Sequence, residues 1–200
     1  MIGLRFDILM QSNNSEMGKM NLNDILTLVK NAKRSYRDAA AEAMLDMPEL
    51  LPELIEKTFD TDDPLHVKAA WVLELVCIQD CTLLDQHINA FIRGMSRLKH
   101  ESALRPVSKI CSIWCAYYFS DMSDLDGLDQ KEINQIISCN FDWLIEDHKV
   151  ATQVFAMETL KLWGRREKWI NEELRLILEK NADSGTSGYK AHARKLLKNL

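Results

Sequence analysis

The sequence predicts an all-α fold, arranged as an α-α superhelix (solenoid) of about five antiparallel helix pairs. Apolar residues recur at positions i, i+3, i+4 and i+7 along most of the chain, which is the spacing of one face of an α-helix. Almost no segment alternates apolar and polar residues with the period of two that a half-buried strand requires. The chain has only seven glycines and four prolines, too few for the turns of a many-stranded sheet.

Each predicted helix is bounded by Asp, Asn, Ser, Pro or Gly, the residues that cap or end helices. The predicted helices cover residues 22–33, 35–46, 48–59, 65–79, 82–97, 101–119, 130–146, 149–163, 168–181 and 187–199. The polar stretch at residues 120–129 predicts a solvated turn in which an Asp or Ser caps the next helix. A second polar stretch, residues 181–188, predicts a mobile join that lets the last helix close the stack.

Two of the predicted helices open with the same pattern, 34 residues apart. Alignment of His66 with His100 places Ala69 on Ala103, Leu73 on Val107, Val76 on Ile110, Cys77 on Cys111 and Cys81 on Cys115. Related openings follow, at less regular spacing, from Tyr36, His148 and Tyr189. Small residues one turn inside a helix let its neighbour approach closely. A repeated structural unit therefore explains the matches, because stacked helix pairs bury a continuous core.

These openings resemble the HEAT/armadillo-like repeat superfamily, whose second helix often runs Asp, an aliphatic or aromatic residue, Arg or Lys, then an Ala-rich turn and a Leu. The stretches "DPLHVKAA", "SYRDAAAEAML" and "GYKAHARKLL" are similar to that pattern. Arg37, Lys68 and Lys190 stand at its basic position. The resemblance covers about residues 21–200. It implies a curved stack of helix pairs that binds a protein or peptide in an extended groove.

The resemblance implies a single HEAT-like repeat domain at residues 21–200, preceded by an N-terminal extension, residues 1–20, whose flexibility is left open. The units that begin at His100 and His148 depart from the pattern, the first of them through Pro106. Charged residues interrupt the short apolar patch of the extension, so no secretory signal is expected. Acids also interrupt the longest apolar runs before the roughly 18–20 residues that a membrane span requires. No association with a membrane is therefore predicted.

The five cysteines lie in apolar helical contexts, which favours reduced thiols and a cytoplasmic protein. Cys77 and Cys81, and again Cys111 and Cys115, are four residues apart, so each pair is expected to share a helix face. Four thiolates could bind zinc, but this spacing within a helix lacks the tight turn of structural zinc sites. The surrounding Val, Ile and Trp residues favour cysteine as a small core residue. No metal or other cofactor is predicted.

Histidines recur near predicted helix starts, at His66, His100 and His148, and a row of them would offer a metal site or a pH sensor. The expected separation of about 10 Å between neighbouring units is too large for a shared metal and favours surface or capping roles. The stretch "DLDG" suggests a calcium loop, but Met122 and Ile133 would occupy positions that require carboxylates. The sequence also lacks the motifs of phosphate-binding loops, serine hydrolases and zinc proteases.

Charge is distributed unevenly along the chain, whose net charge is −5. Residues 41–86 contain eleven acids and only Lys57 and Lys68 as bases, whereas residues 161–200 contain ten Lys or Arg and five acids. The basic end is mild compared with the dense basic face of a nucleic-acid-binding protein. Nucleic acid is therefore not the predicted partner.

The predicted function is that of a noncatalytic scaffold that binds a protein or peptide in a helical-repeat groove. The basic repeat positions, if aligned along one side, would favour an acidic partner. The segment "KLWGRREKW" places aromatics beside arginines, a combination that anchors peptides, although its tryptophans also suit partial burial on either side of Gly164. The candidate partner-binding residues are Arg37, Lys68, Arg105, Lys149, Lys190, Trp163, Arg165 and Arg166.

An enzyme on the same scaffold is the alternative, because alkylpurine DNA glycosylases and phycobilin lyases belong to this superfamily. A glycosylase requires an electropositive groove that contains a carboxylate and aromatic residues. The acidic segment at residues 41–86 argues against such a groove. Catalytic activity and oligomeric state are left open, and the noncatalytic interpretation is preferred.

Overall fold

The computed structural model describes residues 20–120, 127–181 and 185–200. Within these ranges the protein is all-helical and contains no strand, which confirms the predicted α class. The predicted N-terminal extension lies outside the described residues except for Met20. The elements are α2 (Leu22–Thr27), α3 (Arg34–Leu45), η2 (Pro48–Leu50), α4 (Leu51–Phe59), α5 (His66–Gln79), η3 (Cys81–His87), α6 (Ile88–Met95), α7 (Glu101–Tyr118), α8 (Gln130–Ile145), α9 (Val150–Trp163), α10 (Lys168–Lys180) and α11 (Ser187–Leu197), where η denotes a 3-10 helix.

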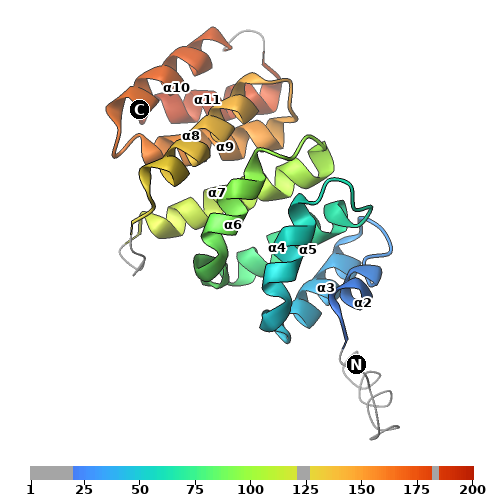
Figure 1. The fold of residues 1–200 in the computed structure, drawn as a ribbon. Helices are drawn as coiled ribbons and strands as arrows, with labels where there is room; N and C mark the ends of the chain where they lie inside the picture. Colours follow the sequence, from blue (N-terminus) through green and yellow to red (C-terminus); the bar gives the residue numbers. More distant parts are fainter. Residues whose placement is uncertain (1–19, 121–126, 182–184) are drawn as a thin grey trace, which may run out of the picture.

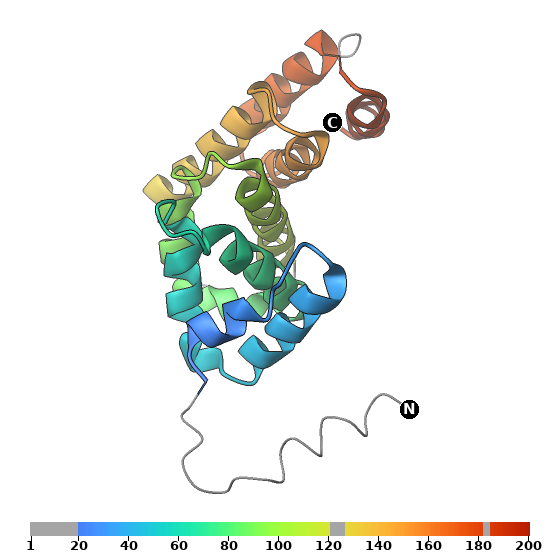
Figure 2. The same cartoon turned by 90° about the vertical axis from the view of Figure 1, so that its right-hand side faces the viewer.

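The helices lie in two rows that follow the length of the molecule (Figures 1 and 2). In one row α3, α5, α7 and α9 each pack against the next, and α11 packs against α9. In the other row α4, α6 and α8 pack in the same order, while α10 packs against α9. In Figure 2, α3 and α11 project toward the same side at the two ends of the molecule.

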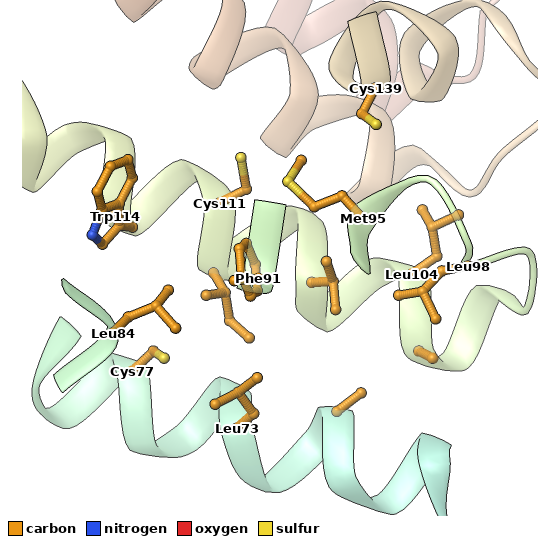
Figure 3. Close-up of a cluster of buried hydrophobic side chains, with 14 of the residues drawn as sticks. Leu73, Cys77, Leu84, Phe91, Met95, Leu98, Leu104, Cys111, Trp114 and Cys139 are labelled. Carbon is orange, nitrogen blue, oxygen red and sulfur yellow. The ribbon is translucent and has the colours of Figure 1, made fainter. Parts of the chain in front are cut away.

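Helix α5 is buried more completely than an ordinary surface helix because α3, α4 and α7 all pack against it. Its sequence "HVKAAWVLELVCIQ" is accordingly apolar on most sides. Figure 3 shows Leu73 and Cys77 of α5 in one buried cluster with Phe91 of α6 and Trp114 of α7. The aligned alanines, Ala69 and Ala103, are both fully buried, as close packing of their helices requires.

The first helix is shorter than its apolar pattern predicts. The sequence predicts a helix over residues 22–33, but α2 ends at Thr27. The side chain of Asn31 accepts a hydrogen bond from the backbone N–H of Lys33 at 2.9 Å, which forms a local turn in place of a further helical turn. Val29 is nevertheless fully buried. Its apolar side chain therefore contributes to the core although it lies beyond the end of the helix.

The predicted helix over residues 82–97 is divided between η3 and α6. Asp80 is extended and ends α5, and its carboxylate accepts hydrogen bonds from the N–H and the hydroxyl of Thr82 at 3.0 and 2.6 Å. Cys81 therefore lies beyond α5, and the expectation that Cys77 and Cys81 share a helix face is wrong. Cys111 and Cys115 do lie within α7, and both are buried.

Polar side chains cap α8 and α11. Asp129 accepts a hydrogen bond from the N–H of Glu132, whose side chain accepts one from Asp129 in return, so the predicted Asp cap after the polar turn is confirmed. The remainder of that turn, residues 121–126, lies outside the described ranges. The hydroxyl of Thr186 caps α11 by accepting a hydrogen bond from the N–H of Tyr189, while residues 182–184 of the predicted mobile join are not among those described.

Candidate functional site

A buried carboxylate joins α5 to α7. Glu74 lies in the middle of α5 and is only 3% exposed. Its two oxygens accept hydrogen bonds from the two Nη atoms of Arg105 at 3.1 and 2.8 Å, and Nζ of Lys109 donates at 3.2 Å. Burial alone would raise the pKa of Glu74, but the hydrogen bonds and charges of Arg105 and Lys109 outweigh it and lower the pKa. Glu74 is therefore ionised, and both of its oxygens are occupied.

Trp71, one turn before Glu74 on α5, is fixed by a second contact with α7. Its Nε1 donates to the backbone carbonyl oxygen of Ser102 at 2.8 Å. In a regular helix that carbonyl would accept the N–H of residue 106, but Pro106 has no N–H to donate. The proline that departs from the repeat pattern therefore leaves a free acceptor, and Trp71 of the neighbouring helix uses it.

Arg37 of α3 extends the same network across a third helix. Its guanidinium carbon lies 5.7 Å from the centroid of the Trp71 ring, within cation–π range. Its Nε is buried and has no hydrogen-bond partner among the described residues. Lys68, one turn before Trp71, is partly buried and forms no ion pair within the described part of the chain.

These contacts define a surface that runs across α3, α5 and α7, hereafter called the basic strip. It contains four basic side chains, one aromatic residue and one carboxylate. These contacts join Arg37, Trp71, Glu74, Arg105 and Lys109, and Lys68 is included because it lies one turn before Trp71 on α5. The strip can bind negative charge, because its bases outnumber its single acid.

The structure brings together three of the five predicted basic repeat residues, Arg37, Lys68 and Arg105, in the basic strip. Lys149 is exposed at the start of α9, outside the strip, where its backbone N–H lies 3.4 Å from a carboxylate oxygen of Glu101. Lys190 lies further along the row, on α11, and is partly buried. The basic repeat positions therefore do not all have the same environment.

In the segment "KLWGRREKW", Trp163 is fully buried, and its ring stacks on that of Tyr118 with centroids 5.9 Å apart. The expectation that both tryptophans are partly buried is wrong for Trp163, which is a core residue. Arg166 covers the edge of this cluster, since it donates a hydrogen bond to Oη of Tyr118 at 3.4 Å. All five residues from Arg165 to Trp169 are exposed, so a partner can reach this part of the segment, including Arg165 and Arg166.

The histidines do not form the evenly spaced row that the sequence suggests. The rings of His66 and His100 have centroids 6.1 Å apart, closer than the expected 10 Å or so. They approach because α5 and α7 start side by side, and His100 caps α7 by accepting the N–H of Ser102 at 3.2 Å. His148 instead contacts the carboxylates of Glu101 and Glu146.

The stability of the protein is expected to fall as the pH is lowered through the titration of His66. Burial, and after it the charge of His100, lowers the pKa of His66 from 6.5, while Asp60 and Asp63 act in the opposite direction. The unfolded chain therefore binds this proton first, so the contribution of neutral His66 is complete above pH 6.5 and is lost as the pH falls toward its folded-state pKa. Urea unfolding across this pH range should show that the free energy of unfolding depends less steeply on pH in His66→Gln than in the native protein. Equal slopes in the two proteins would contradict the assignment.

Sequence reasoning did not select Trp71, Glu74 or Lys109. An available signal was the single acid in the apolar run "WVLELVCI", because a carboxylate at such a position requires a buried basic partner. The sequence alone did not identify that partner. Arg105 and Lys109 lie on a different helix, 31 and 35 residues away.

Burial raises the pKa of the Cys77 thiol to about 12 and that of Cys139 to about 11, so both are protonated core residues. Within the described ranges no group of three or more His, Cys, Asp or Glu side chains is arranged to bind a metal ion. None of the described helices combines the length and the apolar character needed to cross a bilayer. Comparisons of the chain with protein-family models, with curated proteins and with solved structures found no match in any of the three.

Proposed function

We propose that this protein is a noncatalytic scaffold of the HEAT/armadillo-like type, a solenoid of antiparallel helix pairs that binds an acidic protein or peptide. The two rows of helices and the 34-residue register between α5 and α7 support the repeat assignment. The free thiols suit a reducing compartment, for which we propose the cytoplasm.

The basic strip is the observation that carries the proposed function. It spans three successive helices of one row. Two of its four basic side chains, Arg105 and Lys109, pair with its carboxylate, Glu74, while Arg37 lies over Trp71. Repeat proteins bind extended partners along such rows, and charge complementarity directs the choice of partner.

A binding role accounts for the strip better than a glycosylase-type reaction does. A catalytic carboxylate must be free to contact the substrate, whereas both oxygens of Glu74 already accept hydrogen bonds from Arg105 and Lys109. Glu74 therefore has a structural role between α5 and α7. The strip retains the charge and the aromatic surface that recognition of a partner requires.

Affinity purification with the full chain as bait tests this proposal. A protein with an acidic segment should bind the native chain at low ionic strength and should be released by salt. The variant Lys68→Glu should lose this protein, because it reverses a charge of the strip that no described acid neutralises. Lys131→Glu, which makes the same charge change at an exposed position on α8, should retain it.

Equal retention by the native chain and by Lys68→Glu would remove the strip from the proposal. Bound material that disappears after nuclease treatment would identify nucleic acid as the partner and would overturn the preference for a protein. Each variant must have the same melting temperature as the native chain. A loss of binding then results from the changed surface and not from unfolding.

A further inference from the structure

We propose that Arg37, Lys68 and Trp71 form a subsite for a carboxylate of the acidic partner, at the α3–α5 end of the basic strip. This inference rests on the proposed function and makes it more specific. It assigns binding to one end of the strip and a structural role to the other. It also identifies the group that is bound as the planar carboxylate of an Asp or Glu side chain.

The two ends of the strip differ in charge compensation. At the α7 end of the strip, Arg105 and Lys109 both donate to Glu74, so much of their charge is already neutralised. At the α3 end, neither Arg37 nor Lys68 forms an ion pair with a described residue. A partner carboxylate therefore gains more from Arg37 and Lys68, because it does not compete with a carboxylate of the protein itself.

Arg37 and Trp71 are preorganised for binding. The bond from Nε1 of Trp71 to Ser102 fixes the indole, and the guanidinium of Arg37 lies 5.7 Å from its ring centroid. An arginine held in this way loses little further freedom on binding, and its planar set of donors matches a carboxylate.

The charges of the neighbouring helix favour a peptide as the partner. Helix α4, which packs against α5, presents the exposed acids Glu53 and Glu56, and Asp60 follows it. A long phosphate backbone that extended from the strip across α4 would be repelled by these acids, whereas a peptide can place one carboxylate locally. Trp71 is only partly buried and offers an aromatic surface to an apolar residue beside that carboxylate. The subsite therefore fits an acidic peptide that also contains apolar residues.

Fluorescence anisotropy with a labelled peptide of alternating Glu and Leu residues tests the subsite on the full chain. The native chain should bind this peptide and should not bind the matched peptide of alternating Gln and Leu. Arg37→Gln should weaken binding about tenfold, which corresponds to about 1.4 kcal/mol. Arg37→Lys should bind with intermediate affinity, since it keeps the charge and loses the planar donors. Lys131→Gln, a matched loss of charge on α8, should bind like the native chain.

The possible results separate this inference from the proposed function. Equal binding of the Glu and Gln peptides by the native chain would overturn the proposed preference for acidic partners. Selective binding of the Glu peptide that Arg37→Gln and Arg37→Lys leave unchanged would overturn the subsite alone. Tighter binding of single-stranded oligothymidylate of equal charge, lost in Arg37→Gln, would show that the group bound is a phosphate and would also overturn the inference.

Discussion

Replacement of Trp163 by alanine is expected to lower the free energy of unfolding by about 3–5 kcal/mol, the largest effect of any substitution considered for this protein. Trp163 has no exposed surface, its ring stacks on Tyr118, and it meets Phe119 edge-on with centroids 5.0 Å apart. Removal of the indole leaves a cavity that rigid neighbouring rings cannot easily fill. Urea unfolding followed by circular dichroism measures this loss.

Trp169→Ala is the matched control, because Trp169 lies six residues further along the chain and is 51% exposed. Its ring stacks on Phe141, with centroids 6.0 Å apart, so the substitution should cost about 1 kcal/mol or less. A stable Trp163→Ala variant that fails only to bind its partner would contradict the core assignment. That result would restore Trp163 to the partner-binding surface that the sequence suggests.

Arg105→Glu is expected to destabilise the protein by about 3 kcal/mol, because it places a second carboxylate beside the buried Glu74. Arg105 is 31% exposed and Lys109 28% exposed, so water still reduces part of the effect. Lys149→Glu, at an exposed position, should change stability by no more than about 0.5 kcal/mol. Urea unfolding of both variants measures their losses in free energy of unfolding.

A double variant tests whether the Arg105 effect comes from the ion pair. Glu74→Leu combined with Arg105→Leu should be more stable than either single substitution, because it leaves neither group of the pair unpaired. Additive losses would instead show that the two side chains contribute independently. The pH dependence supplies a second check. Because Glu74 has a lowered pKa, its contribution is complete above the ordinary Glu value of 4.5 and is lost as the pH falls through the folded-state pKa.

Most of the helices could be predicted from the sequence because their signals are local. Apolar spacing and capping residues located α5 and α7 to within about one residue at each end, inside the usual uncertainty of such assignments. The errors occurred where a side chain bound nearby backbone. Asn31 formed a turn that shortened α2, and Asp80 ended α5 before Cys81. The sequence gives only a weak signal for such a bond between a side chain and nearby backbone. The surrounding packing decides whether this bond or a further helical turn forms.

The candidate site was predicted only in part. The repeat register places Arg37, Lys68 and Arg105 at equivalent positions and assigns them the same role. The structure separates them, since Arg105 is paired with Glu74 and Arg37 lies over Trp71. Whether a basic side chain is neutralised depends on which acid lies opposite, and that acid belongs to another helix.

The sequence by itself determined the all-helical class, the approximate helix ends and the register between α5 and α7, because each depends on residues a few turns apart or on a repeated pattern. Only the tertiary structure decided that Trp163 is core, that Glu74 joins two helices, and that the carbonyl left free by Pro106 receives Trp71. Burial and hydrogen bonding between distant segments set these roles. Their energies depend on which surfaces meet, and the helical period does not specify that.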